Sequence, residues 1–272
     1  MNQTTRKLLL DITHCEDVNT CLNPSTVMHP CLKVVRVQVR EGRENYQVPE
    51  PWSGDLENAP LLFVSSNPSI GCDVYPKDKW KDDCIVDFFH NRFLVSKPTC
   101  CATTRDHDKS WSKENGNGYV TSNLCQCGIY KNVSYWSSIR ARAVELMERD
   151  VVPGKDYAIT EVVHCKSKRE KDAENAQANC MEKYFSKILS CSNAKVIIVV
   201  GEIAQKAMKK AFKILPSGGE FERSMLCGFE RLVLAIPHPN ARGGSKKLSV
   251  LSDYNKIKQE VKEELSRQFY AN

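Results

Sequence analysis

Four short runs of aliphatic residues most constrain what this chain can fold into. Each run is almost continuous in Val, Ile and Leu, which is typical of strands that are buried on both faces of a sheet. Segments with helical spacing of apolar residues separate the runs, and this alternation indicates a mostly parallel sheet covered by helices. The four expected strands are 59–66, 157–165, 194–200 and 231–237.

The segments between and after these strands predict amphipathic helices. In the first of them, Ile139, Ala143 and Leu146 fall on one face. The last begins at a Ser-Asp pair that suits a helix N-cap. We therefore expect an α/β fold, a three-layer αβα sandwich around a central four-stranded, mostly parallel sheet. The expected helices are 136–150, 173–190, 202–212 and 252–269.

One long stretch interrupts the alternation of strands and helices. Residues 72–130 are polar and rich in turn-forming residues, although 82–93 has helical character. Long irregular insertions beside a ligand-binding edge are often functional. A chain of 272 residues can bury one large core. We therefore predict a single domain over residues 1–272, with 72–130 as an insertion.

The composition narrows the class of protein. A net charge of +6 permits a polyanionic partner without requiring one. The chain shows no secretion signal, and no apolar run approaches the length of a membrane span. We therefore expect a cytoplasmic or nuclear protein that does not contact membranes, with the cytoplasm as the first choice. We also expect it to be a monomer. The odd number of cysteines, 13, argues against a disulfide framework and leaves buried thiols or a metal site.

Polar motifs lie at the carboxyl ends of three of the expected strands or directly after them. Because the carboxyl ends of parallel strands meet at one edge of a sheet, we expect these motifs to converge on one ligand site. In the last motif, a proline on each side of the histidine restricts the backbone. Taken alone, each motif is also compatible with an ordinary turn. The motifs are "SSNPS" (65–69), "EVVHC" (161–165) and "HPNA" (238–241).

Together the three motifs resemble those of the uracil-DNA glycosylase superfamily, over residues 8 to about 242 with the insertion outside. The resemblance implies an enzyme that hydrolyses the N-glycosidic bond between a DNA base and its sugar. It implies that Asn67 positions the attacking water and that His238 donates to the base oxygen O2. Ser66 and Pro68 would contact the base. A rigidly held donor suits negative charge that develops on the base only in the transition state.

The cysteines are most similar to those of the iron–sulfur branch of this superfamily. There, a cysteine ending the second strand is followed by another in the next helix, and Cys165 and Cys180 have this arrangement. Two further ligands lie near the N-terminus; Cys15 and Cys31 are the candidates, although the usual Cys-x-x-Cys is absent and Cys21 competes. The resemblance implies a 4Fe–4S cluster that joins the N-terminus to the core. Free thiols and zinc in the same cysteines are the alternatives.

Glu161 departs from the superfamily, because related uracil-binding sequences have asparagine at this position. An asparagine amide can pair with O4 and N3–H of uracil, whereas a carboxylate accepts from the exocyclic amine of cytosine. A protonated carboxyl could also donate to cytosine N3. The structural alternative is a carboxylate paired with a nearby Lys or Arg.

A cytosine reader requires a modified base, since excision of ordinary cytosine would destroy the cell's own genome. The sequence resembles members of the superfamily that excise glucosylated hydroxymethylcytosine from phage DNA as an antiviral defence. The insertion carries aromatic residues that we expect to line a roomier, sugar-accepting pocket. These are Trp80, Phe88, Phe89 and Trp111.

A basic loop follows the His-Pro motif and is the candidate DNA contact. Its side chains could hold phosphates or fill the gap left by a flipped nucleotide. A solvated loop is the alternative. The expected DNA-binding residues are Asn240, Arg242, Lys246 and Lys247.

The leading function is thus a DNA glycosylase for a modified cytosine. The first alternative is a repair glycosylase for uracil or another deaminated base, which release of free uracil would favour. The second is a non-catalytic, metal-stapled nucleic-acid-binding protein. The presence of both Asn67 and His238 argues against this non-catalytic alternative. A protein that has lost catalysis needs neither a residue to position the water nor a donor to the base oxygen.

Overall fold

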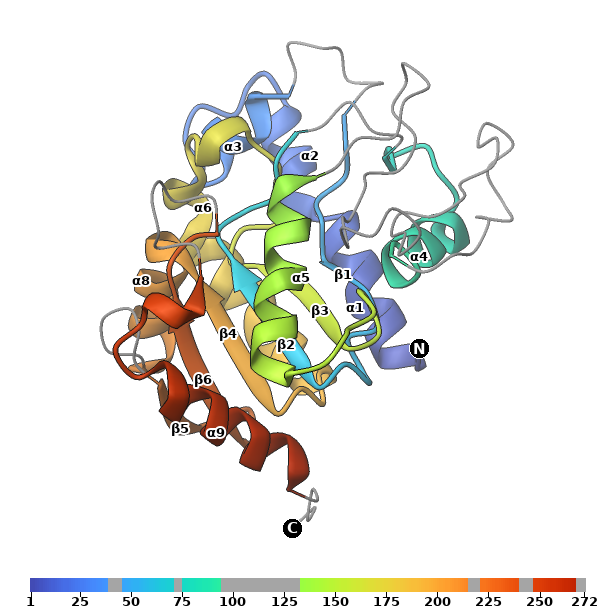
Figure 1. Ribbon diagram of the computed structural model, residues 1–272. Helices are drawn as coiled ribbons and strands as arrows, with labels where there is room; N and C mark the ends of the chain where they lie inside the picture. The colour runs from blue at the N-terminus through green and yellow to red at the C-terminus, as the bar shows by residue number, and fades with distance from the viewer. Residues whose placement is uncertain (39–45, 71–74, 94–132, 215–220, 240–246, 268–272) are drawn as a thin grey trace.

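The parallel core of the molecule agrees with the sequence expectation (Figure 1). The inner strands β3 (Tyr157–Glu161), β2 (Leu61–Ser65), β4 (Val196–Val200) and β6 (Phe229–Ile236) run parallel in this order. The first three are buried along their full length, which explains their continuous aliphatic runs. The computed structural model describes residues 1–38, 46–70, 75–93, 133–214, 221–239 and 247–267.

The sheet is wider than the four-stranded one expected, because an antiparallel strand flanks the parallel core at each edge. The full order is β1-β3-β2-β4-β6-β5. Strand β1 (Trp52–Ser53) has two residues, too few to show any periodicity. Strand β5 (Phe221–Leu226) is half-buried over most of its length and carries charged residues, so it lacks the aliphatic run that marks the inner strands.

Helices cover both faces of the sheet and form two separate cores. Leu61 and Phe63 of β2 face one core, to which α5 (Ser134–Met147) and α9 (Tyr254–Ser266) contribute. Leu62 and Val64 face the opposite core, as the alternation of side chains along a strand requires. The three-layer αβα sandwich is therefore confirmed.

The second face is covered by a larger set of helices, which includes the N-terminal segment. Of these, the segment expected as one helix over 173–190 contains a π-helical turn, Met181–Phe185, directly after Cys180. Such turns occur often at functional sites.

Within the described ranges, no helix is long and apolar enough to cross a membrane. The remaining helices are α1 (Gln3–Thr13), α2 (Glu16–Leu22), α3 (Leu32–Arg36), α4 (Asp82–His90), α6 (Ala173–Cys180), α7 (Ser186–Cys191) and α8 (Gly201–Phe212).

The register of the parallel strands brings the predicted motifs to one edge. Ser65 at the end of β2 pairs with Glu161 at the end of β3. Val200 at the end of β4 pairs with Ile236 at the end of β6. The residues that follow these strands therefore leave the sheet side by side, as the rule for parallel α/β sheets predicts.

Of the insertion, only residues 75–93 lie among the described residues. Helix α4 confirms the helix expected at 82–93. Phe88 and Phe89 are buried in the hydrophobic core and Trp80 packs against it, so the expectation that they line the ligand pocket is wrong. Their periodicity on an amphipathic helix explains this placement. Trp111 lies outside the described residues.

Arg231 connects strand β6 to the end of helix α7, and its substitution tests how much this contact between sheet and helix stabilises the fold. Its side chain is fully buried, and Nη2 donates to the carbonyl oxygens of Leu189 (2.8 Å) and Ser192 (2.6 Å) at the end of α7. Arg231→Met should lower the free energy of unfolding by about 2–4 kcal/mol, because two buried carbonyls lose a charged donor. Arg6→Met removes an exposed pair with Asp83 and should lower it by less than about 1 kcal/mol. Urea denaturation of both variants checks this, and equal losses would contradict it.

Candidate active site

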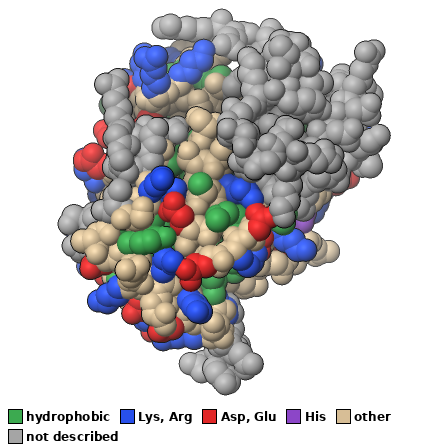
Figure 2. Space-filling model, in the orientation of Figure 1, with side chains coloured by type: hydrophobic (Ala, Val, Ile, Leu, Met, Phe, Trp, Pro, Cys, Tyr) green, Lys and Arg blue, Asp and Glu red, His purple; other side chains and the backbone are tan. Residues whose placement is uncertain are grey.

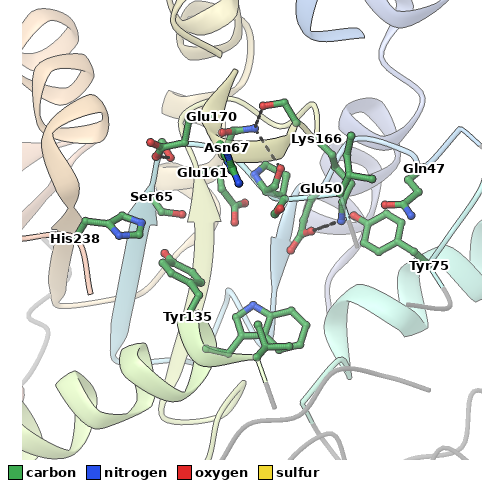
Figure 3. A pocket seen from close by; sticks show the side chains of 18 of the residues that line it. Gln47, Glu50, Ser65, Asn67, Tyr75, Tyr135, Glu161, Lys166, Glu170 and His238 are labelled. Carbon is green, nitrogen blue, oxygen red and sulfur yellow. Dashed lines mark hydrogen bonds and ion pairs between the residues drawn. The ribbon is translucent and has the colours of Figure 1, made fainter. Parts of the chain in front are cut away.

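A cavity of about 500 Å³ opens at the carboxyl ends of the parallel strands (Figure 3). Its walls come from the loops after β2, β3 and β6, from the start of α5, and from the segments before β1 and after α4. The cavity brings together all of the residues expected to act on the base: Ser66, Asn67, Pro68, Glu161 and His238.

The side-chain amide of Asn67 is held by three hydrogen bonds. Its Nδ2 donates to the carbonyl oxygens of Pro68 (3.1 Å) and Cys165 (3.2 Å) and to Oγ of Ser167 (3.0 Å). This fixes which end of the amide is the oxygen. Oδ1 is buried and has no hydrogen-bond partner among the described residues. It therefore needs a donor, which a bound water could supply.

His238 is half-buried and packs between an aromatic ring and a glycine. Its imidazole stacks on Tyr135, with ring centroids 5.6 Å apart. Gly201, at the start of α8, has a φ of +80°, and a Cβ there would lie 3.3 Å from the His238 side chain. Burial lowers the pKa of His238, although the carboxylate of Glu170 acts in the opposite direction. A neutral imidazole can donate one N–H, as the proposed role requires.

Glu161 is a buried carboxyl in the floor of the cavity. Only 4 % of the residue is exposed, and Oε2 has no hydrogen-bond partner within the described part of the chain. Burial and the negative charge of Glu50 raise the pKa of Glu161 well above its usual range, while Arg92 and Lys166 act in the opposite direction. The carboxyl is therefore suited to hold a proton near neutral pH.

Glu50 lies beside Glu161 and carries the opposite shift. Lys166 Nζ lies 3.2 Å from Oε2 of Glu50, Tyr75 donates to the same oxygen at 3.1 Å, and Arg92 donates to Oε1. Burial opposes ionisation here, but the two cations outweigh it and lower the pKa of Glu50. The neighbouring carboxyls Glu50 and Glu161 thus differ in protonation because the nearby cations are paired with Glu50. Opposite shifts of this kind are typical of catalytic acid and base pairs.

Sequence reasoning missed this polar group entirely. Glu50 lies in a proline-flanked segment without a motif, and Arg92 lies at the end of α4, far along the chain. Tyr75 and the α5 residues Tyr135 and Trp136 also line the cavity without any periodic signal. Lys166 offered one clue, because it directly follows the "EVVHC" motif.

The segment after β3 has unusual backbone geometry. Arg169, Glu170 and Asp172 have φ values of 55°, 58° and 62°, a region that residues other than glycine seldom adopt. Arg169 and Glu170 both line the cavity, and Glu170 accepts a hydrogen bond from Ser66 Oγ. Pro68 contributes its carbonyl oxygen, which accepts from the backbone N–H of Ser167 at 3.0 Å.

The expected DNA-binding loop is largely outside the described residues. Asn240, Arg242 and Lys246 lie there, whereas Lys247 is exposed at the start of a short 3₁₀ turn, Leu248–Val250. Over α5 and α9, the face in Figure 2 carries Lys, Arg, Asp and Glu side chains intermixed rather than one basic patch. Lys258 of α9, for example, forms an ion pair with Glu148 at the C-cap of α5.

The four cysteines expected as cluster ligands are all buried and lie within electrostatic range of one another. Cys15 caps the start of α2, Cys31 precedes α3, Cys165 follows β3 and Cys180 ends α6. Burial raises the pKa of Cys165, and Cys180, Cys31 and Cys15 raise it further. The described residues contain no group of three or more His, Cys, Asp or Glu side chains arranged to hold a metal ion.

Polar groups surround these sulfurs. Asn179 Nδ2 lies 3.5 Å from Cys31 Sγ, and Lys183 Nζ lies 3.9 Å from Cys15 Sγ. N–H donors at sulfur are part of the surroundings that tune iron–sulfur clusters. Cys21, the competing residue, instead contacts Nδ1 of His29 at 3.3 Å. The four sulfurs thus lie close enough to raise one another's pKa values, and Asn179 and Lys183 place N–H donors beside two of them.

Fold and cavity define the class as an α/β protein whose ligand site lies at the carboxyl ends of a parallel sheet. A family model, the uracil DNA glycosylase superfamily, matches residues 88–265, or 178 of the 272 residues. The chain belongs to this superfamily, which indicates a DNA glycosylase, a hydrolase that acts on DNA. No curated protein matches the chain significantly. The matched part includes Glu161 and His238 and begins after Asn67.

The raised pKa of Glu161 predicts how stability depends on pH. Above its usual pKa, the unfolded chain releases the Glu161 proton while the folded chain keeps it, so wild type loses stability as pH rises through this window. Glu161→Gln removes the titration and keeps the side-chain size. Its melting temperature should exceed that of wild type by several degrees at pH 8 and by much less at pH 5.

Thermal unfolding at the two pH values checks this expectation. Glu174→Gln makes the same substitution at an exposed position of α6 and serves as the control. A difference between Glu161→Gln and wild type that stays constant from pH 5 to pH 8 would contradict a proton held on Glu161.

Proposed function

We propose that this protein is a DNA glycosylase that removes a modified cytosine, such as glucosylated hydroxymethylcytosine in phage DNA, and leaves an abasic site. The observation that carries the proposal is the buried Glu161 carboxyl in the cavity floor, with its raised pKa and unpartnered Oε2. DNA is the partner, and the biological role is antiviral defence.

Glu161 supplies the hydrogen-bonding pattern that cytosine requires. A protonated carboxyl has one O–H donor and one carbonyl acceptor. The donor pairs with N3 of cytosine, and the acceptor pairs with the N4 amine. A proton supplied at N3 also neutralises the departing base. Cytosine needs this help more than uracil does, because it is the poorer leaving group as a bare anion.

The cavity has room and suitable groups for a substituent on the base. A volume of about 500 Å³ lies within the range of pockets that hold small-molecule ligands. Beside Glu161, the wall carries Tyr75, Trp136 and Gln47, which combine aromatic surface with hydrogen-bonding groups. Such a wall suits a glucosyl or hydroxymethyl group.

The remaining residues take roles that follow from their contacts. His238 donates a hydrogen bond to O2 of the base, where negative charge develops as the glycosidic bond breaks. Asn67 holds the attacking water through Oδ1, since its Nδ2 is already engaged. Ser66 and Pro68 bound the site at the same loop. Arg242, Lys246 and Lys247, with Asn240, would contact the DNA backbone beside the flipped nucleotide.

Cys15, Cys31, Cys165 and Cys180 would hold an iron–sulfur cluster of the 4Fe–4S type. When bound, the cluster supplies covalent crosslinks between distant segments and takes no part in the hydrolysis. The cysteines come from the α1–α2 junction, the start of α3, the end of β3 and the end of α6. The cluster would therefore fasten the N-terminal helices to the core.

A second candidate function is removal of uracil or another deaminated base, which the name of the matched superfamily favours. A carboxylic acid can place its proton on either oxygen, so Glu161 does not by itself reject uracil. Direct comparison of substrates decides between the two.

Base release from oligonucleotides tests the substrate. The series contains uracil, cytosine, hydroxymethylcytosine and glucosylated hydroxymethylcytosine at one position. Wild type should prefer the glucosylated base. Glu161→Asn should lower that activity about 5- to 150-fold, the loss expected for a matched polar contact of about 1–3 kcal/mol, and should raise activity on uracil. A wild-type preference for uracil that Glu161→Asn leaves unchanged would replace this function with the repair function.

Colour and iron content test the cluster. Protein purified without oxygen should be brown and contain close to one cluster per chain. Cys165→Ser or Cys180→Ser should abolish the visible absorption and lower the melting temperature, because both cysteines are buried. Cys191→Ser, at a half-buried position of α7, is the control and should keep the colour. A folded wild-type protein without iron would refute the cluster.

A further inference from the structure

Glu170 is a carboxylate that lines the cavity, and the proposed function does not assign it a role. It lies between Lys168 and Asp172, in the segment whose left-handed backbone was described above, and it is half-buried while Lys168 and Arg169 are exposed. Strained backbone persists where the surrounding structure enforces it, and it is concentrated at functional sites. Here the strain turns Glu170 into the cavity, where it accepts a hydrogen bond from Ser66.

The position of Glu170 is at the end of the cavity where the sugar must lie. Ser66, its partner, directly precedes Asn67, and the Glu170 carboxylate acts on the titration of His238. Figure 3 shows Glu170 near Asn67 on the His238 side, with Glu50 and Tyr75 on the far side of Glu161. A base held between Glu161 and His238 would present its glycosidic bond to the Asn67–Glu170 end.

The reaction needs a proton acceptor at this end. The attacking water must lose a proton, and the amide of Asn67 cannot usefully accept one. His238 is engaged as the donor to O2. The proton of Glu161 is directed at the base, and the carboxylate of Glu50 is paired with Arg92 and Lys166. Among the cavity residues that the structure describes, Glu170 is the carboxylate that these assignments leave.

We propose that Glu170 is a catalytic residue, the general base that takes the proton from the water held by Asn67; this rests on the proposed glycosylase function. The C1′–N1 bond breaks and its electron pair leaves with the base, which receives the proton of Glu161 at N3. The water oxygen bonds to C1′, and its proton passes to Glu170. Exchange with solvent then returns a proton to Glu161 and removes one from Glu170, so the net reaction consumes one water.

Single-turnover base release from glucosylated hydroxymethylcytosine DNA tests the role. Glu170→Gln should slow release about 100-fold or more, the usual contribution of a general base, and should change the affinity for the same DNA less than 3-fold. Glu170→Gly keeps the left-handed backbone at no steric cost and opens space at the carboxylate. Added formate should restore at least a tenth of wild-type activity to it. Glu174→Gln is the control for loss of an exposed negative charge on the same segment.

Four results would overturn the assignment. Release by Glu170→Gln within 10-fold of wild type would show that no proton passes to this residue. A loss that formate does not relieve in Glu170→Gly, or one matched by an equal loss of DNA affinity, would make Glu170 a structural or binding group. If wild type releases no base from any DNA of the substrate series, the proposed function itself fails, and the role of Glu170 fails with it.

Discussion

The cavity depends on the way Glu50 pairs with two buried cations. Arg92 comes from the end of α4 and Lys166 from the segment after β3, so one carboxylate joins parts of the chain that are far apart in sequence. The backbone of Glu50 adds to this link, since its N–H donates to the carbonyl of His164 (2.9 Å) and its carbonyl oxygen lies 2.8 Å from His164 Nδ1. Removal of the Glu50 carboxylate would take away the counter-charge that these two buried cations share, which is strongly destabilising.

The parts of the molecule with a strong local signal were predictable from the sequence. The inner strands have continuous aliphatic runs, and the order of strands and helices then places Asn67, Glu161 and His238 at one edge. Other parts lack such a signal. A strand of two residues such as β1 has no period, and the role of Glu50 depends on partners that only the folded chain brings together. For Phe88 and Phe89 the sequence predicted a role in the ligand pocket, and this prediction was wrong. Aromatic residues on an amphipathic helix more often pack in the core than contact a ligand.

The ten residues 161–170, which start at the last residue of β3, connect the cavity to the buried cysteines. Glu161 begins this segment in the floor of the cavity, Cys165 lies in its middle, and Glu170 ends it beside Ser66. The segment is tied to the loop after β2, because Asn67 donates to the carbonyl oxygen of Cys165 at 3.2 Å. A shift of the backbone at Cys165 would therefore also move the amide of Asn67. The positions of the buried cysteines and of the cavity residues are therefore coupled.

The sheet separates two hydrophobic cores, and each supplies a different wall of the cavity. Tyr135 and Trp136 belong to α5 and pack against one core, whereas Tyr75 belongs to the other. The distance between the two walls is therefore set by the packing of both layers at once. Partial opening of a single layer separates the walls without unfolding the sheet, and such local openings need less free energy than global unfolding. We therefore expect heating to disrupt the cavity before the secondary structure melts.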